Sequence, residues 1–390
     1  MANLVARMEL SKRSVPVARP CFDAEEERLL LEVLRSRWVT QGPRVEEFEK
    51  RFAEAVGARH AVAVSSCTTG LFLGFHGLGI GPGDEVVVPS LSFIATANAV
   101  VHAGATPVFA DVEARSFNLD PEAVAAAIGP RTRAILVVHQ LGLPADLAGI
   151  GQVARERGIA VVEDSACAVG SRLEGRPIGS SENLGCFSFH ARKVLVTGEG
   201  GMIVTRDPEL AARLRRLRHQ GMSISDLDRH RSARPLIEEY PEVGYNFRMS
   251  DLQAALGLAQ LAKLEPFLVR RRLLADRYDR ALAGFPELET PFAPKGAEPN
   301  HQSYIVRVRG ADAERRNRVI EELQRRGVAS RRGLMASHLE ACHRDARRPA
   351  SLPETERAAA QTLLLPIFHE LTEADQDFVI HSLREALDAA

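Results

Sequence analysis

The sequence contains no run of eighteen apolar residues, so it predicts no segment that crosses a membrane. It also has no charge bias, because 50 Lys and Arg residues stand against 51 Asp and Glu residues and the formal net charge is -1. That balance argues against a protein that binds nucleic acid mainly through its overall charge. We find no internal repeat and no low-complexity tract. With 45% apolar and 26% charged residues, the composition is ordinary for a soluble globular protein.

Cysteine is scarce as well. The chain has five cysteines, odd in number and widely spread: Cys21, Cys67, Cys167, Cys186 and Cys342. This is neither a disulfide framework nor a zinc pattern, and it fits a reducing cytoplasm. His338, Cys342 and His343 are close in sequence but lack a second pair of ligands, so we predict no metal site. Residues 1–8 lack the long apolar core of a signal peptide, so we expect no export and predict a cytoplasmic protein.

Seven short apolar runs between residues 61 and 205 predict β-strands. They are apolar throughout rather than alternating, which indicates burial on both faces under helices. Most connections are long enough for crossover helices, which predicts an α/β fold with a mainly parallel sheet. The last connection is shorter and leaves room for an antiparallel final strand. The predicted strands are Ala61–Val64, Glu85–Val88, Pro107–Ala110, Ala134–Val138, Ile159–Glu163, Cys186–Phe189 and Met202–Thr205.

Capping signatures mark two helix starts. Asp23 is a candidate N-cap, and Glu26 is placed to return the hydrogen bond. Leu30, Val33 and Leu34 then predict the apolar face of that helix.

The second signature and a proline suggest how the chain divides. Ser250 and Gln253 open a long helical stretch, and Pro266 is expected to interrupt it where the domain changes. Beyond it helix-like and strand-like segments alternate, with Ser303–Val308 as the clearest strand. A chain of 390 residues is too long for one ordinary core. The predicted divisions are an N-terminal segment at 1–30, a large domain at 31–265 and a small α+β domain at 266–390.

Lys193 carries the strongest chemical signal. It follows the apolar strand that contains Ser188 and enters a loop that ends in the glycines of Gly198–Gly201. Upstream, another apolar strand ends in Glu163 and Asp164. A lysine that forms a Schiff base with an aldehyde cofactor, with an acid that pairs with the cofactor's ring nitrogen, is the pyridoxal phosphate (PLP) arrangement. A surface lysine on a turn is the alternative, which the neighbouring motifs disfavour.

Further candidates follow the ends of other strands, where ligands bind in open α/β sheets. The hydroxyl-rich turn Ser65–Gly70 opens a helix and could bind a phosphate, although such clusters are also ordinary N-caps. Phe93 could stack on a flat ring, and a core phenylalanine is an equally good interpretation. Asp164 would keep a pyridine nitrogen protonated, and its burial requires a partner.

These motifs, with others along the chain, resemble the DegT/DnrJ/EryC1/StrS family of PLP-dependent aminotransferases, which build amino sugars on nucleotide carriers. The resemblance runs from Arg19-Pro20 to Leu365-Pro366. It implies a fold-type I aminotransferase architecture with PLP in the large domain, the pyridoxamine form (PMP) during turnover, and a homodimer with shared active sites. The matching blocks include Thr40–Pro43, Gly83–Val86, Pro107–Phe109, Glu163–Asp164, Ser188–His190, Gly198–Gly201 and Gly244–Arg248.

The resemblance also implies residue roles. Thr68 and Ser188 would bind the phosphate, Asp164 the ring nitrogen and Lys193 the aldehyde. Asn246 would reach the phosphate bound by the partner subunit.

Two cysteines depart from the family pattern. The family usually has Gln or His at the position of Cys167, where it can bond the cofactor's phenolic oxygen, and a thiol is a weak donor. Cys67 replaces a glycine common in the phosphate turn, whose backbone N–H groups would still serve. Both residues, with His190 from the matching Ser188–His190 block, are counted among the predicted cofactor contacts.

Three arginines are candidate substrate contacts. Arg248 could bind the carboxylate of the amino donor, and Arg331 and Arg332 could meet a substrate diphosphate. A second basic cluster at Arg213–Arg218 is interpreted as a solvated helix face rather than as a nucleic-acid site.

The predicted activity is amino transfer from an amino acid, glutamate by expectation, to a nucleotide-linked keto-sugar. The blocks around Cys67, Lys193 and Arg331 look most similar to perosamine-type enzymes that aminate a 4-keto-6-deoxy sugar. A PLP- or PMP-dependent sugar dehydratase is the first alternative, and Lys193 disfavours it because such relatives carry histidine there. A cyclitol aminotransferase and a non-catalytic regulatory protein remain as further alternatives. No nucleic-acid or membrane partner is expected.

Overall fold

The computed structural model describes residues 13–349 and 351–390, so the segment tested above for a signal peptide lies outside the described residues. The seven predicted strands form one seven-stranded sheet, and each prediction agrees with the observed bounds to within two residues. The main sheet contains β1 (His60–Val64), β2 (Glu85–Pro89), β3 (Thr106–Ala110), β4 (Thr132–Val138), β5 (Ala160–Asp164), β8 (Leu184–Ser188) and β9 (Gly201–Thr205).

The order of strands in this sheet is β1-β9-β8-β5-β4-β2-β3. The pairs from β8 to β3 are parallel, whereas β9 runs antiparallel to both β8 and β1. The mainly parallel sheet and the antiparallel final strand are therefore confirmed. The short connection between β8 and β9 that carries Lys193 forces the reversal, because a parallel return needs a long crossover.

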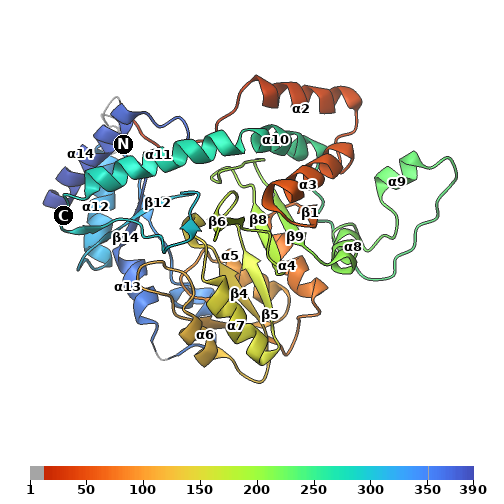
Figure 1. Cartoon of the computed structure of the whole chain (residues 1–390), viewed down its shortest axis with the longest axis horizontal. Helices are drawn as coiled ribbons and strands as arrows, with labels where there is room; N and C mark the ends of the chain where they lie inside the picture. The colour runs from red at the N-terminus through yellow and green to blue at the C-terminus, as the bar shows by residue number, and fades with distance from the viewer. Residues whose placement is uncertain (1–12, 350) are drawn as a thin grey trace, which may run out of the picture.

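Helices cover both faces of the sheet, as the apolar strands predict (Figure 1). On β1, Val62 and Val64 pack with α4, α5 and α8, while Ala61 and Ala63 pack with α3 and α10. This alternation follows from the two-residue period of a strand. The helices of this part are α2 (Ala24–Ser36), α3 (Pro43–Val56), α4 (Cys67–Gly77), α5 (Ala95–His102), α6 (Pro121–Ala127), α7 (Leu147–Arg157), α8 (Pro208–Leu217) and α10 (Asp251–Ala262), with the 3-10 turn η1 (Gln140–Gly142).

The capping box of α2 is confirmed, and its predicted apolar face is correct at Val33 but wrong at Leu34. Asp23 accepts from the first turn, and Glu26 accepts from the Asp23 N–H at 2.8 Å. The helix buries Glu26, Leu29 and Val33, and Leu34 is 55% exposed. Glu26 turns this face toward α10, where its carboxylate accepts from Gln260. The buried face of α2 is thus determined by a paired charge, Glu26. The spacing of apolar residues alone did not indicate this.

The break between α10 and α11 (Leu264–Leu282) falls earlier than predicted. Ser250 caps α10 with Gln253 as expected, and α10 ends at Ala262. Pro266 does not interrupt a helix, because it lies in the first turn of α11, where a backbone N–H has no helical partner to lose. Lys263 is the junction of the two helices.

A second, antiparallel sheet lies in the C-terminal part, in the order β10-β12-β14-β13. It packs with α11, α12 and α14 around a cluster that also contains Val15 from the N-terminal segment. The predicted domain boundaries stay a prediction.

The remaining helices and 3-10 turns are α9 (Asp226–Arg231), α12 (Ala313–Arg325), η2 (Ser337–Leu339), η3 (Ala341–His343), α13 (Pro353–Gln361) and α14 (Glu373–Ala389). The strands of the second sheet are β10 (Leu288–Glu289), β12 (Tyr304–Val308), β13 (Arg331–Arg332) and β14 (Thr362–Leu365), and a third sheet contains β11 (Ala297–Glu298), β6 (Arg172–Leu173) and β7 (Arg176–Pro177).

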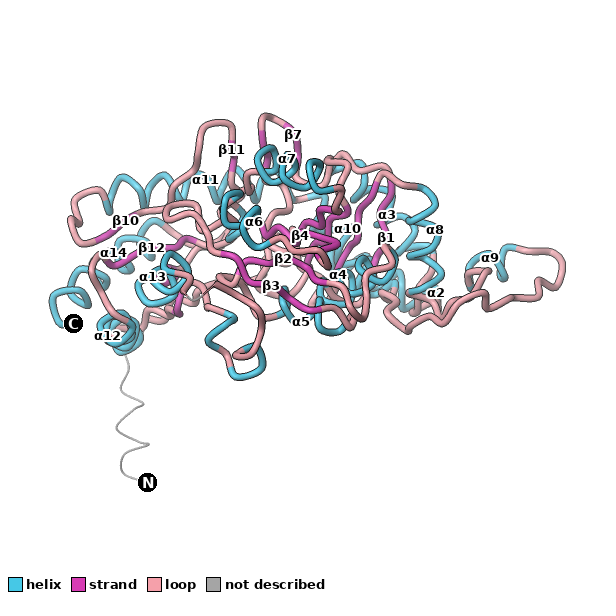
Figure 2. The backbone as a smooth tube through the Cα atoms, turned by 90° about the horizontal axis from the view of Figure 1, so that it is seen from below, coloured by secondary structure: helices cyan, strands magenta, loops and turns pink. Residues whose placement is uncertain are grey.

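One segment stands away from the rest of the molecule. The loops around α9 project from the body at the end opposite α14 in both views (Figures 1 and 2). They expose the apolar side chains of Ile237, Tyr240 and Val243, which are 87%, 56% and 84% accessible. Within the described part of the chain, no helix combines the length and the apolar character that crossing a membrane requires.

Candidate active site

Asp164 ends β5 as a buried carboxylate, 6% exposed. Its Oδ2 accepts from the Thr96 hydroxyl at 2.8 Å, and its Oδ1 accepts from the Ala166 N–H at 3.1 Å. Both donors are neutral, and no described Lys, Arg or His forms an ion pair with this carboxylate. Burial raises the pKa of Asp164. Asp164 can therefore pair with a cationic group of a bound ligand, because no side chain of the described residues forms an ion pair with it.

The preceding residue, Glu163, fixes this end of β5 from the opposite side of the strand. Its carboxylate accepts from Ser181 at 2.6 Å, from Asn183 at 2.7 Å and from His139 Nε2 at 3.0 Å. His139 Nδ1 accepts from the Ala145 N–H, so Nε2 is the nitrogen that carries the proton. Burial works to raise the pKa of Glu163, but these bonds outweigh it and hold the pKa below its ordinary value. Nothing in the sequence indicated this network beyond an acid at the end of an apolar strand.

Lys193 lies close to Asp164 and to both unusual cysteines. Its Nζ is 3.1 Å from Cys167 Sγ, and Cys67 Sγ is 3.9 Å from Asp164 Oδ1. Burial opposes the charge on Lys193, but Cys167 and the carboxylate of Asp164 outweigh it, so the pKa of Lys193 is raised. The structure thus brings an amine, a buried acid and two sulfur atoms into one cluster.

The hydroxyl-rich turn adjoins this cluster. Ser66 caps α4, and its hydroxyl accepts from the Thr69 N–H. Thr68 lies in the first turn of this helix and is half-buried. Gly201 pairs with Val64 on β1 and with Ser188 on β8, so Gly201 is the strand residue between Ser188 and the start of the turn. A Cβ on Gly201 would lie 2.5 Å from the Ser66 carbonyl carbon, so only glycine permits this approach.

The structure decides one of the two interpretations of Phe93, as a core residue, and leaves the other, stacking on a ring, as a prediction. Phe93 is 59% exposed in the turn before α5, so the interpretation as a core phenylalanine is wrong. Ring stacking stays a prediction. His190 is half-buried beside the Lys193 turn, where its Nδ1 accepts from the Arg192 N–H at 3.2 Å. Burial lowers the pKa of His190.

Asn246 and Arg248 lie on an ordered loop against the turn of their own chain. The Phe247 carbonyl accepts from the Ser65 N–H at 2.8 Å, Asn246 is exposed, and Arg248 Nη1 is 3.0 Å from His219 Nδ1. The loop therefore presents Asn246 outward rather than into the Lys193 cluster of its own chain.

Arg331 and Arg332 are exposed on β13. Arg332 lies 3.4 Å from Glu340, and neither arginine has a described contact with the Lys193 cluster. A role in substrate binding stays a prediction for both residues.

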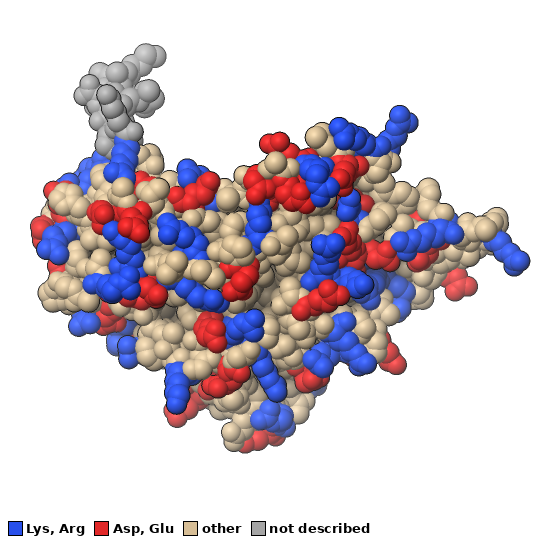
Figure 3. Space-filling model, turned by 45° about the horizontal axis from the view of Figure 1, so that its top comes forward, with Lys and Arg blue, Asp and Glu red and all other residues tan. Residues whose placement is uncertain are grey.

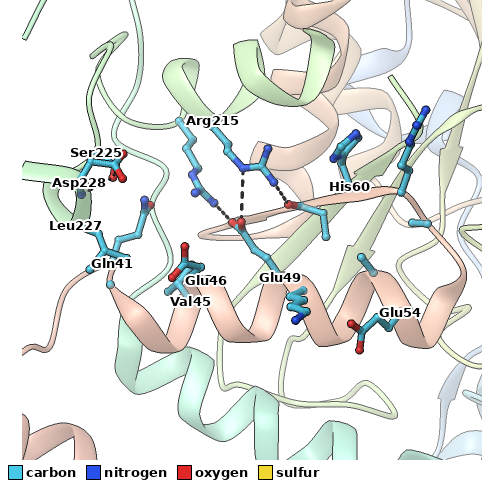
Figure 4. Close-up of a pocket in the computed structure, with 17 residues that line it drawn as sticks. Gln41, Val45, Glu46, Glu49, Glu54, His60, Arg215, Ser225, Leu227 and Asp228 are labelled. Atoms are coloured by element: carbon cyan, nitrogen blue, oxygen red, sulfur yellow. Dashed lines mark hydrogen bonds and ion pairs between the residues drawn. The ribbon is translucent and has the colours of Figure 1, made fainter. Parts of the chain in front are cut away.

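The basic cluster after β9 is not the solvated face that we expected. Arg218 is buried, pairs with Glu49 and donates to the Ala63 carbonyl at 2.6 Å. Arg215 donates to the Ala61 carbonyl, and Glu49 accepts from the Ala63 N–H. These side chains form hydrogen bonds with the backbone N–H and C=O groups at the open edge of β1 (Figure 4). The edge therefore has few free groups with which another strand could pair.

A cavity of about 530 Å³ lies along α3 and this strand edge, and its described lining includes none of the predicted site residues. The other two arginines, Arg213 and Arg216, pair with Glu242 at 2.9 and 3.3 Å. On the face shown in Figure 3, basic and acidic side chains are interspersed. The cluster therefore has structural partners, and it offers no support for a nucleic-acid surface.

The Lys193 cluster fits PLP chemically. It offers an amine for an aldehyde, a buried carboxylate that lacks a cationic partner, and the N-terminus of α4 with nearby hydroxyls for a phosphate. The donor set contains nothing that conflicts with the group.

Comparisons with known proteins agree with this chemistry. The model of the DegT/DnrJ/EryC1/StrS aminotransferase family matches residues 20–384. The aminotransferase TlmJ from Streptoalloteichus hindustanus is 40% identical, with 97% of this chain and 100% of that chain covered and a TM-score of 0.89. DesV from S. venezuelae, solved with a ketimine intermediate, is 37% identical over 97% of this chain and 99% of that chain, with a TM-score of 0.87. Spr1654 from Streptococcus pneumoniae, assigned as a sugar aminotransferase and solved in its PLP form, is 29% identical over 97% and 99%, with a TM-score of 0.90.

Proposed function

Because the chain belongs to the DegT/DnrJ/EryC1/StrS aminotransferase family, we propose that it transfers an amino group from an amino acid to a nucleotide-linked keto-sugar. It is a PLP-dependent aminotransferase of fold type I. One observation carries the assignment of the active site to this chain's own residues. Lys193 lies beside a buried Asp164 that has only neutral hydrogen-bond donors.

Each residue of the cluster has a role that its surroundings support. Lys193 would bond the cofactor's aldehyde and, once displaced by the donor amine, carry protons to and from the reacting carbon. Asp164 would pair with the protonated ring nitrogen, which is the cation that its environment lacks. Bound PLP supplies the sink for the electron pair left when the donor loses a proton.

The phosphate end has its own set of groups. Thr68 and Ser188 would donate hydroxyls, and the first N–H groups of α4, including that of Cys67, would add backbone donors. Phe93 and His190 would border the site and contact the cofactor from its open sides. Cys167 would lie nearest the phenolic side of the ring, as a weak donor.

Glutamate is the proposed donor, with the PMP form arising in the first half of the reaction. Arg248 would bind the donor's carboxylate, and Arg331 and Arg332 the diphosphate of the sugar nucleotide. The proposed acceptor is a 4-keto-6-deoxy sugar of the perosamine type, supported by sequence blocks at the phosphate turn, at Lys193 and at Arg331. A cyclitol is the other acceptor class to test.

The proposed enzyme is a homodimer with shared sites. The exposed Asn246 and the projecting segment around α9, with its accessible Ile237 and Val243, support a surface that a second copy covers. In that arrangement Asn246 would reach the phosphate bound by the partner subunit.

A coupled screen tests the proposed function. Purified enzyme is incubated with glutamate and a panel of keto-sugar nucleotides and keto-cyclitols, and release of 2-oxoglutarate is measured. We expect turnover with a 4-keto-6-deoxy sugar nucleotide that depends on Lys193. A dehydratase would instead consume the sugar without releasing 2-oxoglutarate, and turnover with cyclitols alone would replace the proposed acceptor class.

A further inference from the structure

Two buried carboxamides reach the active-site loops from the segment that leads into β12. Gln302 is 7% exposed, and its side chain makes two hydrogen bonds to one short stretch of main chain. Its Oε1 accepts from the Val194 N–H at 2.9 Å, and its Nε2 donates to the Arg192 carbonyl at 2.7 Å. The two peptide groups that it holds are those on either side of Lys193.

We propose that Gln302 is a positioning residue for Lys193. Because its carboxamide pairs with the peptide groups before and after the lysine, it fixes the backbone torsions from which that side chain extends. The Lys193 N–H is held independently, by the His190 carbonyl at 2.8 Å. A lysine that must reach a single carbon atom gains from such preorganisation, since small displacements of reacting groups reduce rates strongly. This inference rests on the proposed role of Lys193.

The neighbouring carboxamide of Asn300 holds the opposite side of the same contact. Asn300 is fully buried, and its Nδ2 donates to the carbonyls of Cys167 and Val169, both at 2.8 Å. Its Oδ1 accepts from the Gln302 N–H at 2.8 Å, so the two amides are linked. Lys193 Nζ and Cys167 Sγ are therefore held 3.1 Å apart by anchors that lie two residues apart in sequence.

The anchoring segment is itself held in place. Arg271 is fully buried on α11, and its guanidinium donates to the carbonyls of His301 and Gln302 at 2.8 and 3.3 Å. Burial lowers the pKa of Arg271 to about 10, which still leaves it charged at neutral pH. The chain continues directly from this segment into β12.

The chain offers a matched control for a buried glutamine with no role in the site. Gln376 on α14 is also fully buried, and its Nε2 donates to the Leu274 carbonyl at 2.9 Å. Substituting leucine at either position removes a buried carboxamide, so a merely structural role predicts similar consequences at both.

The test compares Gln302→Leu with Gln376→Leu in the full-length enzyme. Two rates are measured beside the melting temperature: uptake of PLP by the cofactor-free protein, followed by absorbance, and the single-turnover reaction of the loaded enzyme with glutamate. We expect Gln302→Leu to slow both rates by about 10- to 100-fold, in the range that misplacement by roughly 1 Å produces. Gln376→Leu should lower the melting temperature but leave both rates within about twofold, because it touches neither loop.

A second variant guards against a failure of Gln302→Leu to fold. Gln302→Met keeps the length of an unbranched side chain but loses both hydrogen bonds, so its rates should match those of Gln302→Leu. Unchanged rates in the foldable Gln302 variants would overturn the positioning role and leave the proposed function intact. Failure of the proposed function is visible separately, since the wild-type enzyme would then release no 2-oxoglutarate with any keto-sugar nucleotide in the coupled screen.

Discussion

At the residue scale, the proposed chemistry depends on a carboxylate that is buried without a cationic partner of its own. Asp164 has only neutral donors and a raised pKa, while Glu163, one residue earlier, accepts from three side chains and has a lowered pKa. Strand geometry separates the two acids, because successive side chains point to opposite faces. One acid is satisfied structurally, and the other is available to a ligand.

Replacing Asp164 should therefore damage turnover. We expect Asp164→Ala to lower kcat/KM by about 100- to 1000-fold or more, since loss of one partner of a buried ion pair costs about 3–5 kcal/mol. Asp164→Glu keeps the charge and should retain more activity. Steady-state kinetics of both variants decide the point, and near-normal turnover in Asp164→Ala would refute the pairing with the ring nitrogen.

The same carboxylate should destabilise the protein when PLP is absent. The folded protein holds the Asp164 proton more tightly than the unfolded chain, because burial raises the pKa of this group. Stability is thus lost as pH rises from the unfolded pKa of about 3.9 through the raised folded pKa. We expect cofactor-free Asp164→Asn to melt at a higher temperature than wild type near neutral pH, with a difference that closes toward pH 4. Calorimetry across this pH range measures the difference in melting temperature. A variant that melts below wild type at neutral pH would contradict the prediction that the buried carboxylate destabilises the cofactor-free protein.

At the element scale, the strand ends and loop anchors determine where the site residues lie. The local signals predicted the strands and the capping boxes of α2 and α10, because those depend on residues within a few positions. The positions of Lys193, of Asp164 and of the Ser65–Gly70 turn at strand ends were also predictable from the sequence, whereas their roles stay a prediction. The anchoring of Lys193 by Gln302 was not, because the two residues are 109 positions apart and nothing local in either segment indicates the contact.

Burial of charged groups misled the sequence reasoning in a similar way. Arg218 was expected on a solvated face, and Leu34 on an apolar one. In both cases a buried acid accounts for the difference: Glu49 of α3 pairs with Arg218, and Glu26 of α2 accepts from Gln260 of α10. Such pairs depend on tertiary contacts, which helical periodicity does not reveal.

Gly142 provides a test of the loop anchors. It has a φ of +93°, and a Cβ there would lie 1.9 Å from Asn300 Oδ1, the anchor of the Cys167 loop. Gly79 has a φ of +75° but open space around it, so it serves as the control. We expect Gly79→Ala to cost about 1–2 kcal/mol of unfolding free energy, the left-handed strain alone. Gly142→Ala should cost more and also slow PLP uptake, as urea unfolding and absorbance would show. Equal costs at both sites would argue against the close packing of Asn300.

At the scale of the whole molecule, one chain presents features that a second copy would complete. Asn246 is exposed on a loop that contacts the Ser65–Gly70 turn, and the segment around α9 extends away from the body with accessible apolar side chains (Figure 1). Both are consistent with the proposed sharing of active sites across a dimer axis.

Subunit exchange tests that sharing. Asn246→Asp and Lys193→Ala proteins should each be inactive alone. In a mixed dimer one site carries both defects and the other carries neither, so mixing should restore up to about half of the wild-type activity per mixed dimer. Exchange is verified with differently tagged chains. Verified exchange without recovery would place Asn246 in its own chain's site, or outside any site.

The attachment of PLP to Lys193 is the central claim, and it has a direct measurement. The PLP-loaded protein is reduced with borohydride, which makes a lysine–cofactor bond permanent, and its peptides are then mapped by mass spectrometry. The reduced cofactor should be found on the peptide that contains Lys193, and Lys193→Ala protein should lose both the label and the yellow colour after dialysis against amine-free buffer. A label on a different lysine, or Lys193→Ala protein that turns over normally, would contradict the claim.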